Sequence, residues 1–233
     1  MPLKIDNYSN EILKNISFNL EAGEHLIILG SNGVGKTTLA KVLCGMTPSS
    51  SVSIDNINPS KVYGEKRAKL INYIPPKLDV FDEFITVREF LELGGAFNND
   101  LSIDASLERL HIKHLANKAC KMLSSGESQL LLIASALLHD ARYTIFDEPT
   151  ANLDPQKMQL LFNLLKDETT LQSKLIITHN LDLAYKLGYN ILFLEEGAVK
   201  FYGSNADFFT QTHLDALYDG SVEKCENNIV VKL

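Results

Sequence analysis

The sequence predicts an α/β fold in which helices cover a mainly parallel sheet. Apolar, strand-like runs alternate with helical patterns along most of the 233 residues. The run HLIILG (25–30) is continuously apolar, as strands buried on both faces of a parallel sheet are. Regular alternation of strands and helices indicates strand–helix–strand units, which build such a sheet.

Ahead of this core, the first 24 residues have strand-like patterns. Two short strands are expected at 2–8 (PLKIDNY) and 14–20 (KNISFNL), followed by the turn EAGE. The apolar strand at 25–30 leads through glycines into a helix at 36–46. Further strands are expected at 52–56 and 70–75.

Residues 77–122 predict an inserted helical subdomain within a single domain spanning 1–233. Helical patterns at 87–95 and 106–123 flank the polar stretch GAFNNDLSID there. Beyond the insertion, we expect helices at 125–140, 154–168, 181–188 and 208–218, strands at 142–149 and 174–179, a hairpin at 190–203 that turns at Glu196-Gly197, and a polar tail.

Composition narrows the class of protein. The formal net charge of −7 disfavours a large nucleic-acid footprint, which normally needs a basic face. The three cysteines, Cys44, Cys120 and Cys225, are widely spaced, so reduced thiols in a cytosolic protein are expected. The N-terminus shows no signal-peptide pattern, and the longest apolar run (130–138) is too short to span a bilayer.

One segment carries a phosphate-binding pattern. GSNGVGKT, from Gly30 to Thr37, fits G-x-x-x-x-G-K-[ST] between a strand and a helix. Its amides would cradle phosphate oxygens at the helix N-terminus. Lys36 would reach the β- and γ-phosphates, and Thr37 would offer its hydroxyl to Mg²⁺. The nucleotide contacts predicted here are Gly30, Ser31, Asn32, Gly33, Val34, Gly35, Lys36, Thr37 and Thr38.

A second apolar strand ends in two carboxylates, and this supports the nucleotide site. YTIF is followed directly by Asp147 and Glu148. Asp147 at the strand end is predicted to hold Mg²⁺, usually through water. Glu148 is predicted to act as the general base that polarises the attacking water. Alone, this pair would be a solvated strand end; beside the phosphate-binding loop, the catalytic interpretation is favoured.

The segment Leu123–Glu127 (LSSGE) resembles the signature loop of the ATP-binding cassette (ABC) family, which reads LSGGQ or LSGGE. Residues 151–154 (ANLD) resemble its D-loop, His179 resembles its switch histidine, and Tyr8 lies where the family places an adenine-stacking aromatic. The resemblance covers essentially the whole chain. It implies a P-loop nucleotide hydrolase core with an N-terminal antiparallel β subdomain and an inserted helical subdomain.

The resemblance also implies a working assembly. Two cassettes close head to tail on two ATP molecules, with Ser124, Ser125, Gly126, Glu127 and Asp154 completing the partner's site. A homodimer is favoured over a heterodimer. Multi-span permease subunits would hold the chain at the cytoplasmic face of the membrane, together with an external substrate-binding protein.

The same resemblance assigns roles to two aromatic residues. His179 would contact the γ-phosphate and Glu148, and Tyr8 would stack on adenine. The alternative for Tyr8 is an ordinary half-buried strand tyrosine.

Three positions depart from the family pattern. Pro76 stands where the family has a glutamine that touches Mg²⁺ and the attacking water, and proline has neither a side-chain acceptor nor an N–H. Ser125 replaces the first signature glycine, and Leu130 replaces a frequent arginine. We expect slowed or differently coupled hydrolysis, with nucleotide binding retained.

Two stretches resemble the importers of iron chelates, haem and cobalamin within this family. They are TVREFLELG (86–94) and the ending YGSNADFFTQTHLDALYDGSVE (202–223). This similarity predicts an ATP-hydrolysing importer subunit. A zinc or manganese importer subunit is one alternative, and a soluble cassette without a transport role is the other.

Overall fold

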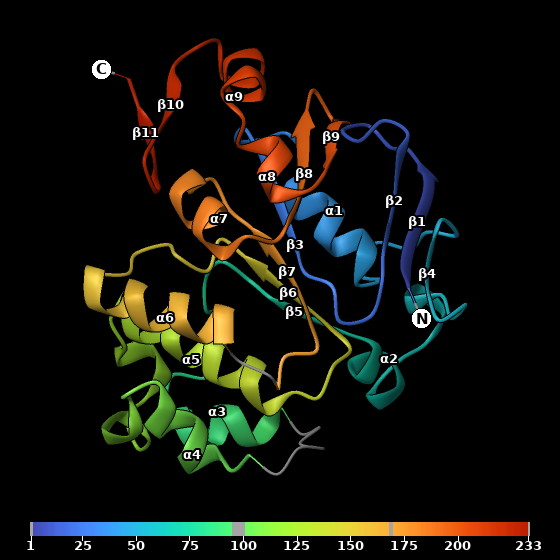
Figure 1. Ribbon diagram of the computed structural model, residues 1–233. Helices are drawn as coiled ribbons and strands as arrows, with labels where there is room; N and C mark the ends of the chain where they lie inside the picture. Colours follow the sequence, from blue (N-terminus) through green and yellow to red (C-terminus); the bar gives the residue numbers. More distant parts are fainter. Residues whose placement is uncertain (1, 95–100, 168–169, 233) are drawn as a thin grey trace.

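The computed structural model describes residues 2–94, 101–167 and 170–232, and it is built on a six-stranded sheet (Figure 1). The strand order is β5 (Ile71–Ile74), β6 (Tyr143–Asp147), β7 (Ser173–Ile177), β3 (Leu26–Gly30), β8 (Asn190–Glu195) and β9 (Ala198–Gly203). All neighbours are parallel except β8 and β9, which form an antiparallel hairpin. The predicted mainly parallel α/β fold is therefore confirmed, and the carboxyl ends of the parallel strands lie along one edge.

A second, antiparallel sheet is formed by the N-terminal part of the chain. Its strand order is β2 (Ile16–Leu20), β1 (Leu3–Tyr8) and β4 (Val52–Ile54). The two predicted N-terminal strands are confirmed, and the strand predicted at 52–56 is present as β4, which pairs with β1 on the side away from β2. Alternate residues are buried along β2 and along β1 as far as Asp6, as expected for a sheet with one face on a core.

The main sheet is packed on both faces. In β3, Ile27 and Leu29 face one apolar cluster, while Leu26 and Ile28 face the other. The first cluster includes the helices α5 (Ser125–Leu138), α6 (Pro155–Asp167) and α7 (Leu181–Leu187). The second includes α1 (Lys36–Leu43) and the antiparallel sheet. This double burial explains the continuous apolar character of the central strands.

The region between β5 and α5 contains short helices. They are α3 (Val87–Leu93), α4 (Ile103–Arg109) and two 3₁₀ turns, Lys113–Leu115 and Cys120–Met122. The continuous helical pattern predicted for 106–123 is wrong, because His111 has φ 57°, a left-handed conformation that a right-handed helix does not continue. Part of the predicted polar stretch, 95–100, lies outside the described residues.

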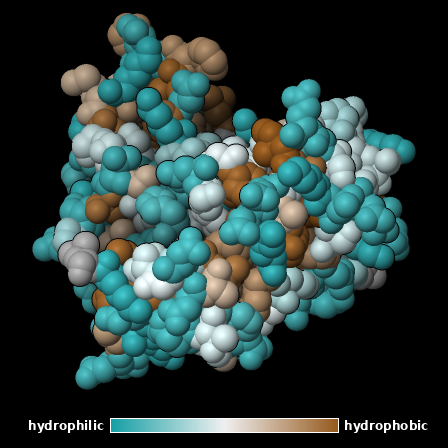
Figure 2. Space-filling view, turned by 90° about the horizontal axis from the view of Figure 1, so that it is seen from above, coloured by the Kyte–Doolittle hydropathy of each residue, from teal (hydrophilic) through white to brown (hydrophobic). Residues whose placement is uncertain are grey.

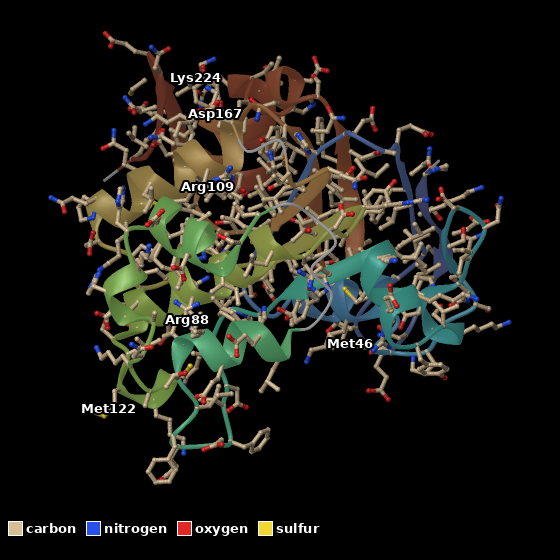
Figure 3. The ribbon with its side chains drawn as sticks, turned by 90° about the horizontal axis from the view of Figure 1, so that it is seen from below. Met46, Arg88, Arg109, Met122, Asp167 and Lys224 are labelled. Atoms are coloured by element: carbon tan, nitrogen blue, oxygen red, sulfur yellow. The ribbon has the colours of Figure 1, made fainter. Side chains whose placement is uncertain are left out.

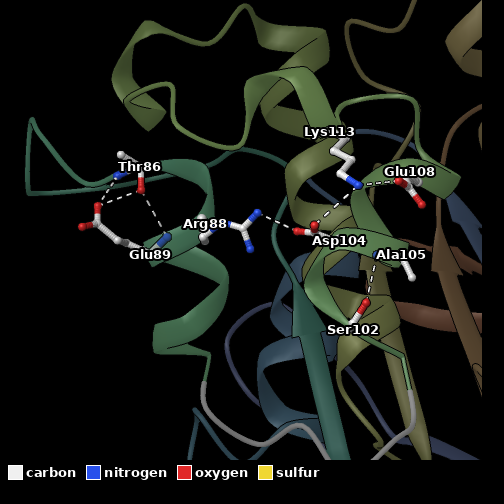
Figure 4. A network of polar contacts seen from close by, with 8 residues as sticks. All are labelled: Thr86, Arg88, Glu89, Ser102, Asp104, Ala105, Glu108 and Lys113. Carbon is white, nitrogen blue, oxygen red and sulfur yellow. Dashed lines mark hydrogen bonds and ion pairs between the residues drawn. The ribbon is translucent and has the colours of Figure 1, made fainter.

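Polar contacts tie α3 to α4 (Figure 4). The guanidinium of Arg88 lies 2.6 Å from a carboxylate oxygen of Asp104, and the Lys113 ammonium bridges Asp104 and Glu108 at 3.5 and 2.5 Å. These groups are exposed to solvent, which screens their charges, so the pairs contribute little to stability. Figure 3 shows Arg88 and Met122 on this same helical part, where Met122 is 70% exposed.

Two regions contain structure that the sequence does not predict. A short helix, α2 (Glu65–Leu70), precedes β5, and the predicted polar tail contains a hairpin of β10 (Val222–Cys225) and β11 (Asn228–Val231). The hairpin is held to α7, since Ile229 N–H donates to the Asp182 carboxylate at 3.1 Å. Before it come α8 (Asn205–Phe208) and α9 (Gln211–Tyr218).

In the part of the chain that the structure describes, no helix has the length and apolar character needed to cross a bilayer. Seen from above in Figure 2, hydrophilic side chains cover most of the visible face, and apolar ones form small separate groups.

Candidate nucleotide-binding site

The loop between β3 and α1 has the backbone geometry of a phosphate cradle. Gly30 has φ 146°, and a Cβ there would lie 2.4 Å from the Leu194 carbonyl oxygen of β8. Gly35 has φ 106° at the N-cap of α1, where a Cβ would lie 2.7 Å from the Leu13 side chain. Any larger residue would therefore force the loop away from its neighbours, and glycine is required at both positions.

Lys36 reaches back into this loop. Its Nζ donates hydrogen bonds to the carbonyl oxygens of Gly30 at 2.8 Å and Ser31 at 3.0 Å. Burial lowers the pKa of Lys36, and the carboxylates of Glu148 and Asp147 oppose that shift. The ammonium is thus held at the centre of the loop, where phosphate oxygens can replace the two carbonyls as its acceptors.

The Asp147 carboxylate lies beside the first turn of α1. Its Oδ2 accepts hydrogen bonds from Thr37 Oγ1 and from the Tyr73 hydroxyl, both at 2.8 Å. Burial, followed by the charge of Asp147, raises the pKa of Tyr73 well above its usual range, so this hydroxyl remains a donor. A hydroxyl and a carboxylate are the hard oxygen ligands that Mg²⁺ prefers, so Thr37 and Asp147 would fit this ion.

Glu148 is held in an unusual backbone conformation. Its φ is 50°, which is uncommon for a residue other than glycine, asparagine or aspartate. Its N–H donates to the Ile177 carbonyl of β7 at 2.9 Å, and its Oε2 lies 2.9 Å from Nδ1 of His179. The two neighbouring strand ends therefore bring the glutamate and the histidine together, as the resemblance implies.

Two pockets lie on either side of the phosphate loop. A pocket of about 350 Å³ is lined by Ile12, Asn32, Gly33, Gly35, Lys36, Thr37, Thr38 and Glu148. On the other side of the loop, His179 shares a second pocket with Gly30, Ser31 and Asn32. The structure thus gathers the predicted phosphate, metal and catalytic residues around the ends of β3, β6 and β7.

The position of Tyr8 does not support the predicted adenine-stacking role. Tyr8 is only 9% exposed and packs in the core between the two sheets. Strand alternation would turn it outward, but Asn7 has φ 48° and the register shifts between Ile5 and Tyr8, so the ring faces inward. The residue from this region that lines the phosphate-loop pocket is Ile12, which is 45% exposed.

The signature loop forms the start of α5. Ser124 is the N-cap, and its Oγ accepts from Glu127 N–H at 3.3 Å, while Glu127 Oε2 accepts from Ser124 N–H at 2.7 Å. Lys118 lies 3.2 Å from the same carboxylate oxygen. Glu127 thus closes a capping box. Its carboxylate is engaged within the chain, and this position does not support the predicted nucleotide contact of Glu127.

The signature and the D-loop lie close together. Asp154 caps α6, with its Oδ1 accepting from Lys157 N–H at 2.9 Å and its Oδ2 from Lys157 Nζ at 2.6 Å. A Cβ at Gly126 would lie 3.3 Å from both Lys157 Nζ and the Asn152 carbonyl oxygen. Ser124 and Glu127 line a pocket different from that of the phosphate loop. The signature loop and the phosphate loop therefore do not share a pocket within the chain.

A larger cleft lies on another side of Thr37 and Tyr73. It measures about 850 Å³ and extends from the end of β5 to α3 and α5. Its lining includes Thr37, Tyr73, Pro76 and Phe90. The position of the missing glutamine therefore faces this cleft, and Pro76 supplies it with a ring and a carbonyl only.

A phosphate loop, a buried strand-end carboxylate and an adjacent glutamate define a P-loop nucleoside triphosphatase. The family model described as "ABC transporter" matches residues 13–151, and the chain belongs to this family as an ATP-binding, ATP-hydrolysing subunit.

Individual relatives agree with this assignment. A probable iron chelatin transport ATP-binding protein of Helicobacter pylori is 31% identical and covers 99% of each chain. A zinc import ATP-binding protein of Photorhabdus laumondii is 33% identical over 79% of this chain and 69% of its own. Among solved structures, cbiO1 of Clostridium perfringens, part of the transporter complex cbiONQ, is 28% identical with a TM-score of 0.73, covering 92% of each chain.

Proposed function

We propose that this chain drives import of an iron chelate, haem or cobalamin-type substrate from the cytoplasmic face of the cell membrane. The observation that carries this choice is the end-to-end match to the iron chelatin transport relative. The similarity of residues 86–94 and 202–223 to that importer group supports the same choice. Zinc or manganese import is the second candidate, favoured by the zinc import relative.

In the proposed reaction, the residues around the phosphate loop bind the phosphates, hold the metal ion and activate the attacking water. Lys36 and the loop amides bind the phosphates, and Thr37 and Asp147 hold Mg²⁺, which neutralises phosphate charge when bound. Because Oε2 of Glu148 is engaged by His179, we assign Oε1 as the proton acceptor from the attacking water. His179 also contacts the γ-phosphate, whose negative charge it helps to stabilise.

The second cassette of the pair is proposed to be another copy of this chain. Ser124, Ser125 and Gly126 would cover the γ-phosphate bound to that copy, and Asp154 would link the two sites. Support comes from the location of Ser124 in a pocket apart from its own phosphate loop. A related but different cassette is the alternative partner.

The permease is proposed to bind at the large cleft between β5 and α3. This cleft reaches from Phe90 to Thr37, so a segment seated there would contact the residues next to the metal-ligand pair. The membership of the cbiO1 relative in a transporter complex supports such a partner. An external substrate-binding protein would complete the importer.

Capture of partners from detergent-solubilised membranes tests the transport role. We expect the Glu148→Gln chain, loaded with ATP, to retain a multi-span membrane protein, because loss of the general base should trap the closed pair. Mass identification of that protein, followed by uptake assays with radiolabelled iron chelate and zinc, distinguishes the two substrate classes. Recovery of soluble proteins alone, with the bait folded and ATP-bound, would favour a cassette without a transport role.

Ile12 gives a separate prediction about the nucleoside. Because its side chain forms an exposed apolar wall of the phosphate-loop pocket, we propose that it contacts the base or ribose of ATP. Burying about 40 Å² of apolar surface there contributes about 1 kcal/mol, so Ile12→Ala should weaken ATP binding about fivefold. Calorimetric titration measures this change.

Two controls separate nucleoside contact from a general effect. Tripolyphosphate, which lacks base and ribose, should bind Ile12→Ala and the unmodified chain equally well. Ile57 is similarly exposed, at 42%, and lies beside β4. Ile57→Ala should leave ATP affinity unchanged. An equal loss for ATP and tripolyphosphate would assign Ile12 to loop stability.

A further inference from the structure

We propose that Tyr73 is a positioning residue for the metal-binding carboxylate: its hydroxyl fixes Asp147 for Mg²⁺. Tyr73 lies on β5, directly beside β6, and pairs with Ile145. This register places its side chain within reach of Asp147 at the end of β6. The hydroxyl donates to Asp147 Oδ2 at 2.8 Å.

Two donors from different elements converge on one oxygen. Thr37 Oγ1 of α1 and the Tyr73 hydroxyl of β5 both lie 2.8 Å from Asp147 Oδ2. Asp147 is 1% exposed, and a carboxylate buried this deeply depends on hydrogen bonds to set its orientation. With Oδ2 held from two sides, rotation of the carboxylate is restricted and Oδ1 keeps a fixed direction.

The location of Tyr73 connects it to the departure at Pro76. Tyr73, Pro76 and Thr37 line the same cleft of about 850 Å³. Pro76 offers no side-chain polar atom there, whereas Tyr73, three residues earlier, brings a hydroxyl to the carboxylate itself. The strand therefore supports the metal site through the orientation of Asp147. Groups that orient metal ligands commonly change metal affinity by about 10–100-fold when removed.

The inference rests on the magnesium role proposed above, and Tyr73→Phe tests it in the full chain. Both Tyr73→Phe and its reference carry Glu148→Gln, so that ATP is bound without turnover. The melting temperature of each chain is measured with ATP at increasing Mg²⁺ concentrations. The Mg²⁺ midpoint is the concentration at which half of the Mg²⁺-dependent rise in melting temperature is reached. We expect this midpoint to rise about tenfold in Tyr73→Phe. Affinity for ATP in excess EDTA should stay unchanged, because the phosphate loop and Lys36 are untouched.

Tyr143→Phe is the matched control. Tyr143 lies on β6, is fully buried, and its hydroxyl donates to Leu20 O at 3.0 Å and accepts from Leu3 N–H at 2.9 Å. Loss of the Tyr143 hydroxyl should lower the melting temperature and leave the Mg²⁺ midpoint unchanged. A shift shared by both variants would mean that general loosening of the sheet is the cause, and would overturn the proposal.

The remaining outcomes are equally decisive. If the reference responds to Mg²⁺ and Tyr73→Phe has the same Mg²⁺ midpoint, the positioning role is overturned. If Tyr73→Phe no longer binds ATP in excess EDTA, the positioning role is also overturned, because Tyr73 would then support the phosphate loop. If the reference itself binds ATP without any response to Mg²⁺, the magnesium role fails, and the Tyr73 proposal fails with it.

Discussion

Replacing Glu148 by glutamine should reduce ATP hydrolysis by on the order of a thousandfold, the range expected for loss of a general base. The amide is nearly isosteric with the carboxylate and can still lie near His179, but it does not accept a proton from water. The contact between Glu148 Oε2 and His179 Nδ1, at 2.9 Å, places this side chain at the strand ends beside the phosphate loop. ATP affinity should be retained, since Lys36 and the loop are unaltered.

Single-turnover hydrolysis and equilibrium ATP binding measure the two effects separately. Glu195→Gln is the matched control, because Glu195 ends β8 beside the loop residues Gly30 and Ser31 and pairs with Lys200 at 3.4 Å. It should hydrolyse ATP at the unmodified rate. Retention of more than a tenth of the activity in Glu148→Gln would show that another group accepts the proton.

The parts of the fold that sequence analysis predicts are those with a strong local pattern. The buried strands have continuous apolar runs, and the phosphate loop has its own spacing of glycines. The break after α4 has no such pattern, because His111 adopts its left-handed conformation while the apolar residues around it remain buried. The β10–β11 hairpin is short and mostly exposed, so its strands lack the alternation that would identify them.

Some contacts of the candidate site can likewise be predicted from local sequence patterns, and others cannot. Asp147, Glu148 and His179 follow apolar strands, so their meeting at one edge of a parallel sheet can be expected from sequence. The contact of Tyr73 with Asp147 depends on β5 lying next to β6, and strand order cannot be read from local patterns. Tyr8 faces inward because of a single left-handed residue, Asn7; asparagine tolerates that conformation, but its identity alone does not predict the register shift.

Lys36→Met should weaken ATP binding by at least about tenfold, because the ammonium would make charge-assisted hydrogen bonds to phosphate worth about 1.5–3 kcal/mol. Methionine has a similar length and suits a position that is 7% exposed, so the helix α1 should remain folded. The carbonyls of Gly30 and Ser31 lose their donor in the free chain, and a small drop in melting temperature is expected.

Comparing the loss of affinity for AMP with that for ATP identifies which contact of Lys36 is responsible. Lys36 is predicted to reach the β- and γ-phosphates, so binding of AMP should change little while binding of ATP falls. Lys41→Met removes an exposed ammonium from the same helix and should leave both affinities unchanged. Comparable losses for AMP and ATP in Lys36→Met would mean that the ammonium acts through its two bonds to the loop carbonyls, shaping the cradle rather than binding the terminal phosphates.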